Sequence, residues 1–254
     1  MASFVDSDGR GDCLPRGDKC GDTFPVYESR VDPIPRNEWR DAAEAIRGQE
    51  SLVQKIKNQG REGSCASNAA AQAMEMLYVS QGGERHWVEL SAISLYKRVG
   101  RNPDSGSTID SNLRELKRVG ILPRDNAANR NRFDHTMPPR GFYTNYPAGW
   151  ELTAAKFRVL EWWDIQTFDG MISAMLRGYP IVYGRAGHAI CGVRPVLRNG
   201  LWHIKYANSW GDWGDNGFGY DSELYVSGAI ASYGAWSPRV TTELDDTLPK
   251  RVSK

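Results

Sequence analysis

The sequence has few cysteines and histidines, and both shortages limit the sites that it can form. Four cysteines in 254 residues are too few for a disulfide scaffold, although Cys13 and Cys20 are near enough in sequence to bridge each other. A zinc site needs closely spaced ligand pairs, such as Cys-x2-Cys or His-x3-His. The histidines lack this spacing: His86, His135, His188 and His203. We therefore expect no metal site and no cofactor.

The chain also lacks an excess of charge and a long apolar run. Lys plus Arg number 32 and Asp plus Glu 31, so the formal net charge is +1. Because binders of nucleic acid or anionic membranes usually carry a clustered basic excess, we expect neither partner. No apolar run approaches the roughly 18 residues of a membrane span, and residues 1–13 lack the pattern of a signal peptide. The sequence therefore indicates the cytoplasm, or a bacterial or viral assembly.

The two ends of the chain have the composition of irregular segments. Residues 1–33 are rich in Gly, Asp, Arg and Pro and show little periodicity, which predicts an arm rather than a folded unit. The tripeptide Arg-Gly-Asp occurs in it at residues 10–12 and 16–18. This repeat is either a receptor-binding motif displayed on a flexible loop or, more simply, chance in a segment biased to these residues. The arm could also contact an assembly partner. Residues 241–254 predict a solvated tail.

The part that follows the arm has the pattern of helices. Residues 64–79 are strong helix formers, and Ser64 is a candidate N-cap that would place Cys65 on the first helical turn. Turn-forming glycines end the predicted segments. The other helices predicted here span residues 91–99 and 109–119.

After about residue 141 the pattern changes to short segments rich in β-branched and aromatic residues, bounded by turn residues. One helix, at residues 169–177, interrupts them. The order of elements predicts an α+β architecture, with a mainly helical half at 34–140 and a mainly β half at 141–240. The predicted strands span residues 156–160, 181–184, 188–193 and 202–206.

Cys65 is the first candidate for chemistry. A cysteine at a helix N-terminus faces unpaired backbone N–H groups and the positive end of the helix dipole, which both stabilise a thiolate. Its pKa should fall below the usual value of about 8.5. The alternative for a helical cysteine is simple burial. His188 begins an apolar run and Asn208 ends another, so each also has a structural interpretation, as a core histidine and a turn asparagine.

Taken together, three motifs resemble the papain-like cysteine peptidase family, from about residue 34 to about residue 226. Gln59 stands six residues before Cys65, as in the family's glutamine-to-cysteine motif. Residues 187–190, Gly-His-Ala-Ile, resemble its histidine strand, and residues 208–211, Asn-Ser-Trp-Gly, its asparagine motif. The resemblance implies a two-lobed fold, with a helical N-terminal lobe, a β-barrel-like C-terminal lobe and an active site between them.

The resemblance also implies a role for each motif residue. Cys65 would attack the scissile carbonyl of a peptide or protein substrate, and His188 would protonate the leaving amine. Asn208 would orient the imidazole, and Trp210 would shield that contact from water. Gln59 would contribute to the oxyanion hole with the Cys65 backbone N–H. The chain would thus hydrolyse peptide bonds through a covalent acyl-enzyme.

By the same resemblance, an extended peptide would lie between the lobes. The family's glycine loop matches best at Gly106 and Ser107, although a glycine pair is here a single glycine. Gly187 and Ala189 would line the opposite wall.

The sequence departs from the family in ways that leave its activity open. Residue 66 is Ala where the family commonly has Trp, and Glu62 replaces a common disulfide cysteine. No long inhibitory helical segment precedes the catalytic part, so we consider the hypothesis that the arm fills the cleft. The alternative function is a catalytically idle papain-fold component of a larger assembly.

Overall fold

The computed structural model describes residues 12–19 and 21–241. Its longer helices are α1 (Trp39–Ala45), α2 (Cys65–Gly82), α3 (Ala92–Val99), α4 (Ile109–Arg118), α7 (Phe168–Leu176) and α8 (Glu223–Tyr233), and the short ones are α5 (Ala127–Arg130) and α6 (Trp150–Ala154). The strands are β1 (Cys13–Leu14), β2 (Ser107–Thr108), β3 (Val159–Asp164), β4 (Ile181–Arg185), β5 (His188–Arg198), β6 (Leu201–Ala207), β7 (Phe218–Ser222) and β8 (Ala235–Thr241).

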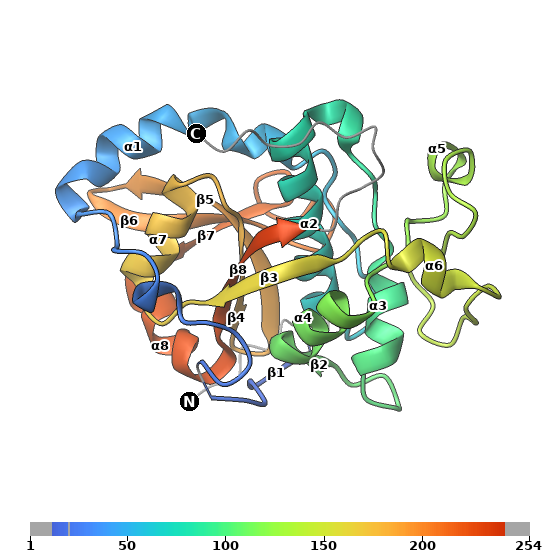
Figure 1. Ribbon diagram of the computed structural model, residues 1–254. Coiled ribbons are helices and arrows are strands. Elements are labelled where there is room, and N and C mark those ends of the chain that lie inside the picture. Colours follow the sequence, from blue (N-terminus) through green and yellow to red (C-terminus); the bar gives the residue numbers. More distant parts are fainter. Residues whose placement is uncertain (1–11, 20, 242–254) are drawn as a thin grey trace.

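Six strands form an antiparallel sheet in the order β3-β8-β4-β5-β6-β7 (Figure 1). The β5–β6 hairpin turns at Asn199 and Gly200, whose φ angles of 51° and 75° suit this residue pair. The α+β prediction is confirmed, and the sheet of the described strands is not a closed barrel. The sheet stays open because β3 and β7, at its two edges, each pair with a single strand. The tip of β3 is instead covered by the arm, where the Asp164 N–H donates to Pro25 O.

Helices cover both faces of this sheet (Figure 1). Residues of β5 alternate between two hydrophobic cores, since successive strand side chains point to opposite faces. Cys191 belongs to the core shared with α2, whereas Ile190 belongs to the core shared with α7. A strand buried on both sides carries a continuous apolar run, which explains the sequence after His188.

Most predicted elements are confirmed with small shifts of their ends. The helix predicted at residues 64–79 is α2 and begins at Cys65, although Ser64 makes no side-chain cap and accepts a hydrogen bond from Asn68 Nδ2 instead. The strand expected at 156–160 starts only at Val159, because the backbone of the preceding residues closes the turn after α6. Helix α8 was not predicted, since Val226 is its only fully buried residue and its apolar residues do not gather on one face. None of the helices in the described part of the chain has the length and apolar character needed to cross a membrane.

A buried ion pair connects the segment before α2 to the helix itself. Lys57 Nζ lies 2.6 Å from Glu75 Oε1, and the two side chains are 8% and 0% exposed. Glu75 also accepts the Leu90 N–H, while its burial raises the pKa of the carboxyl. Removing one partner of such a pair leaves the other buried without its counter-charge.

We therefore expect Lys57→Ala to lower the free energy of unfolding by about 3–5 kcal/mol, measured by urea denaturation with tryptophan fluorescence. Arg47→Ala is the matched control because Arg47 pairs with Glu44 at the surface, where such a loss costs about 0.5 kcal/mol or less. Equal effects of the two substitutions would contradict a structural role for the buried pair.

Candidate active site

The N-terminus of α2 lies against the first residues of β5, and this packing brings Cys65 and His188 together. Cys65 is fully buried and His188 is 5% exposed. The two residues are far apart in sequence, and each stands at the first position of its element. A side chain at the end of a helix or strand lies at the edge of the core. A reacting group can approach it there more easily than in the middle of the core.

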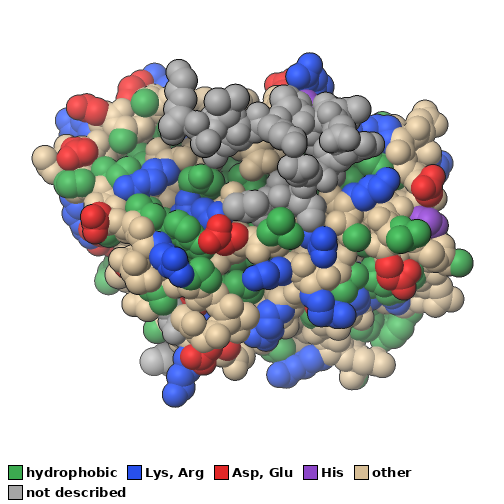
Figure 2. All heavy atoms as spheres, viewed as in Figure 1, with side chains coloured by type: hydrophobic (Ala, Val, Ile, Leu, Met, Phe, Trp, Pro, Cys, Tyr) green, Lys and Arg blue, Asp and Glu red, His purple; other side chains and the backbone are tan. Residues whose placement is uncertain are grey.

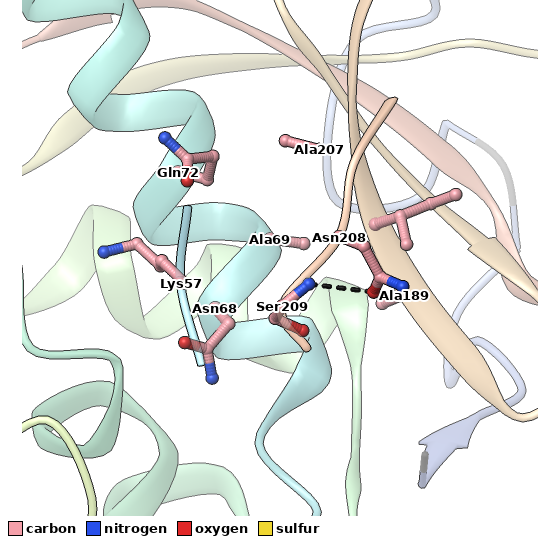
Figure 3. A pocket seen from close by; sticks show the side chains of 9 residues that line it. Lys57, Asn68, Ala69, Gln72, Ala189, Ala207, Asn208 and Ser209 are labelled. Atoms are coloured by element: carbon pink, nitrogen blue, oxygen red, sulfur yellow. Dashed lines mark hydrogen bonds between the residues drawn. The ribbon is translucent and has the colours of Figure 1, made fainter. Parts of the chain in front are cut away.

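The imidazole of His188 is held from both sides. Its Nε2 lies 2.8 Å from Asn208 Oδ1, and the Trp210 ring stacks on it with centroids 4.5 Å apart. The same Oδ1 accepts the Ser209 backbone N–H at 2.8 Å (Figure 3), which identifies this atom as oxygen because a backbone N–H only donates. Nε2 must then carry a hydrogen. Nδ1 has no other hydrogen-bond partner among the described residues and is left for Cys65.

The thiol of Cys65 has a pKa well below its ordinary value. The largest cause is a hydrogen bond from the Cys13 thiol, and the hydrogen bond and positive charge of His188 act in the same direction. The Ala189 backbone N–H adds to this, against the opposing effect of burial. The arrangement stabilises a thiolate beside an imidazolium.

Gln59 reaches the site through a short backbone pairing with the segment after β6. Its N–H donates to Ser209 O, and two residues on along that segment the Gly211 N–H donates to Lys57 O. The Gln59 side chain is buried, accepts the Ser209 hydroxyl at Oε1 (2.5 Å) and donates through Nε2 to Glu62 O (2.7 Å). One Nε2 hydrogen therefore remains for another acceptor. Sequence reasoning did not assign Ser209 this orienting contact.

The N-terminal arm lies in the cleft, against the residues that were predicted to bind substrate. Strand β1 pairs in parallel with β2, and the Ser107 N–H donates to Asp12 O (3.2 Å). Across the cleft, the Cys13 N–H donates to Gly187 O (2.9 Å). Gly106 has φ +91°, and a Cβ there would stand 1.9 Å from Asp12 O. The arm therefore needs a glycine at this position.

Arg16 anchors the arm beside the cleft. Its guanidinium lies 2.7 Å from Asp164 Oδ2 and over the Trp236 ring. The next N–H, of Gly17, donates to the buried Asp110. Arg16 also pairs with Asp18, and both side chains are at most 10% exposed, so this Arg-Gly-Asp tripeptide is engaged within the chain. The first tripeptide begins outside the described residues.

Two residues that the sequence did not single out organise the helical side of the cleft. The Tyr96 hydroxyl donates to Asp104 and accepts the Gly106 N–H, while Asp104 also accepts the Gly63 N–H. A Cβ on Gly63 would stand 2.6 Å from the Gly106 nitrogen. The loop before Cys65 and the loop before α4 are thus held in contact. No local pattern marks this contact, because it joins residues distant in sequence.

A small pocket lies behind the site, between α2 and the sheet (Figure 3). Ala189 is 1% exposed and its side chain lines this pocket, so it is the Ala189 backbone N–H that faces Cys65. The Cys13 thiol is free among the described residues. The suggested Cys13–Cys20 bridge involves Cys20, which lies outside them. Within residues 12–19 and 21–241, no three His, Cys, Asp or Glu side chains are grouped to hold a metal.

Comparison of the whole fold with solved structures gives a papain-like fold, although no family model and no curated protein sequence matches the chain. Xylellain, a cysteine protease from Xylella fastidiosa, matches with TM-score 0.64 and 17% identity over 91% of this chain and 97% of that one. Digestive procathepsin L 3 of Tenebrio molitor larval midgut matches with TM-score 0.63 and 18% identity over 87% of this chain and 75% of that one. Procathepsin B S9 from Trypanosoma congolense matches with TM-score 0.62 and 15% identity over 92% of this chain and 87% of that one. At these identities the likeness establishes the fold alone.

Proposed function

We propose that the chain is a cysteine peptidase that hydrolyses peptide bonds through the Cys65 thiolate. The observation that carries this proposal is the buried Cys65 at the start of α2, beside a His188 whose Nε2 donates to Asn208 Oδ1 at 2.8 Å. The cysteine proteases among the structures of similar fold support it further. A core histidine or a turn asparagine would not need this shared geometry.

Each residue has a defined task in the reaction. The Cys65 sulfur attacks the scissile carbonyl carbon, and the developing oxyanion accepts the free Gln59 Nε2 hydrogen and the Cys65 backbone N–H. His188 then gives its Nδ1 proton to the leaving amine, which leaves a thioester on Cys65. For the second step, His188 takes a proton from water, and the hydroxide attacks the thioester and releases the acid. Asn208 and Trp210 keep the imidazole in place throughout.

Extended peptides fit the same groups that now hold the arm. Ser107 offers a backbone N–H and Gly187 a backbone carbonyl on opposite walls of the cleft. Backbone contacts of this kind accept many sequences, because they do not depend on the substrate's side chains. We propose unfolded or extended protein segments as the substrate class.

A second candidate is an idle papain-fold component of an assembly. The observation that favours it is the occupied cleft, in which Asp12 and Cys13 take the place of a substrate.

Incubation with a mixture of unstructured peptides, followed by mass spectrometry, distinguishes the two. A peptidase produces new termini with wild type and none with Cys65→Ala. Cys191→Ala is the matched control, because Cys191 is an equally buried thiol whose neighbours include the Met76 sulfur rather than a histidine. Absence of cleavage by wild type, also after removal of residues 1–18, would favour the idle component.

Ser209→Ala is expected to lower kcat about 10-fold with little change in KM. The Ser209 hydroxyl fixes the Gln59 carboxamide, so its loss weakens the contact to the oxyanion, which exists only in the transition state. Steady-state kinetics on one peptide measure the split. A changed KM with unchanged kcat would instead place Ser209 in ground-state binding. Ser209→Thr, which keeps the hydroxyl, should recover most of the rate.

A further inference from the structure

We propose that Cys13 and Cys65 form a redox modification site, in which hydrogen peroxide joins the arm to the nucleophile through a reversible disulfide. The proposal rests on the proposed function in one respect, that Cys65 is the reactive thiol of the site. It adds a second cysteine, from the arm, whose sulfur forms and breaks no bond in the peptidase mechanism.

The geometry places the two thiols together by more than one contact. Cys13 is 4% exposed and Cys65 fully buried, within one hydrophobic core. The Cys13 thiol interacts with Cys65 and also donates to Leu14 O at 3.6 Å. The Cys13 backbone is held between β2 and Gly187 O. A disulfide then requires the two sulfurs to approach to a bond length of about 2.05 Å.

The two thiols differ in the way that a reacting cysteine and a resolving cysteine should. Hydrogen bonding from Cys13 and the neighbouring His188 lower the pKa of Cys65, which favours the thiolate. The hydrogen bond to Cys65, burial and the negative charge of the thiolate raise the pKa of Cys13, so Cys13 keeps its proton. Peroxide reacts with thiolates, so Cys65 is oxidised first.

The chemistry balances with peroxide as the only oxidant. The Cys65 thiolate attacks one peroxide oxygen, the O–O bond breaks, and the hydroxide released takes a proton to become water, leaving Cys65 as sulfenic acid. The Cys13 sulfur then attacks the Cys65 sulfur, an S–S bond forms, and the S–O bond breaks with loss of water, which carries the Cys13 proton. Two thiols and one peroxide give one disulfide and two waters. A dithiol reverses the step by exchange.

Two features of the arm suit it to this task. Its pairing with β2 is only two residues long, so a brief opening admits a molecule as small as peroxide. Arg16, three residues beyond Cys13, is fixed by Asp164, so the thiol stays near the site during such openings. The disulfide would fasten the arm in the cleft and protect Cys65 from irreversible oxidation to sulfinic acid.

The test uses the full chain, reduced and then treated with hydrogen peroxide. After alkylation under denaturing conditions and digestion without reductant, mass spectrometry should find the Cys13 peptide joined to the Cys65 peptide. Labelling of native Cys65 by iodoacetamide should fall at least about 10-fold and return with dithiothreitol. Cys13→Ser, or Cys13→Ala as a second variant, should form no disulfide and should accumulate sulfinic acid at Cys65, which dithiothreitol does not reverse. Cys191→Ser is the matched control and should behave as wild type.

Several outcomes would overturn the proposal: a Cys13–Cys20 bridge instead, a Cys65 that passes directly to sulfinic acid in wild type, or no reaction with peroxide. The outcomes that would overturn the proposed peptidase function are different ones. A chain that forms and reverses the disulfide but never cleaves a peptide keeps the redox site and loses the peptidase. A chain that cleaves peptides but forms no such disulfide keeps the peptidase and loses the redox site.

Discussion

His188→Ala is expected to lower kcat/KM for peptide hydrolysis by about 10³-fold or more. The substitution removes the proton donor for the leaving amine and one cause of the low pKa of Cys65, so both the nucleophile and the acid are weakened. Residual activity comes from the oxyanion contacts and substrate binding, which His188 does not provide. Initial rates on a fluorogenic peptide, calibrated by active-site titration, measure the loss.

The matched control is His203→Ala. His203 lies on β6, where its Nδ1 is within hydrogen-bonding distance of the Leu201 carbonyl in its own strand. It should retain nearly full activity, and both variants should unfold at similar urea concentrations. A His188→Ala enzyme within 10-fold of wild type would contradict the assignment of His188 as acid and base.

Deletion of residues 1–18 is expected to raise the initial rate of peptide hydrolysis about 10-fold to 100-fold. The segment is held by two backbone hydrogen bonds across the cleft and by the Arg16–Asp164 ion pair. Contacts of this number and kind stabilise the arm in the cleft by a few kcal/mol, so only a small fraction of the molecules has an open cleft. Rates with and without the segment, at a substrate concentration far below KM, measure that fraction.

The end of the deletion is important because the arm beyond residue 18 is part of the core. Tyr27 is fully buried and Phe24 is 2% exposed, so removal of residues 1–33 should destabilise the fold. Arg16→Ala is a milder variant that should also raise the rate, while Arg36→Ala, which breaks two exposed ion pairs, should not. An unchanged rate after deletion of residues 1–18 would mean that the arm does not restrain the enzyme.

The sequence predicted those parts of the fold that depend on local pattern. The helix at Cys65 and the strand at His188 carry long, uniform runs, one of helix formers and one of apolar residues, so both were found within a residue at their starts. The open edges of the described sheet did not follow from local pattern, because the edges of a sheet are set by contacts between distant segments. Helix α8 was missed because its apolar residues follow no helical period, so local pattern did not indicate it.

The candidate site divides in the same way. Cys65, His188, Asn208 and Gln59 carry recognisable motifs, and the structure brings all four together. Cys13, Tyr96 and Asp104 stand in no motif, because their positions near the site depend on how the arm and two loops meet. The sequence alone could not predict their contribution to the site.

The pH dependence of alkylation at Cys65 tests the central claim most directly. The reaction rate follows the thiolate fraction, and for free cysteine with a pKa near 8.5 it falls about 80-fold from pH 8 to pH 6. Because the folded chain lowers the pKa of Cys65, its thiolate should persist over this range. We expect the rate of iodoacetamide labelling at Cys65 to change less than about threefold in wild type. In His188→Ala, which removes one cause of the low pKa but keeps the Cys13 contact, the rate should decline more steeply with falling pH than in wild type. A Cys65 that follows free cysteine in the wild-type chain would contradict an activated thiolate–imidazolium pair.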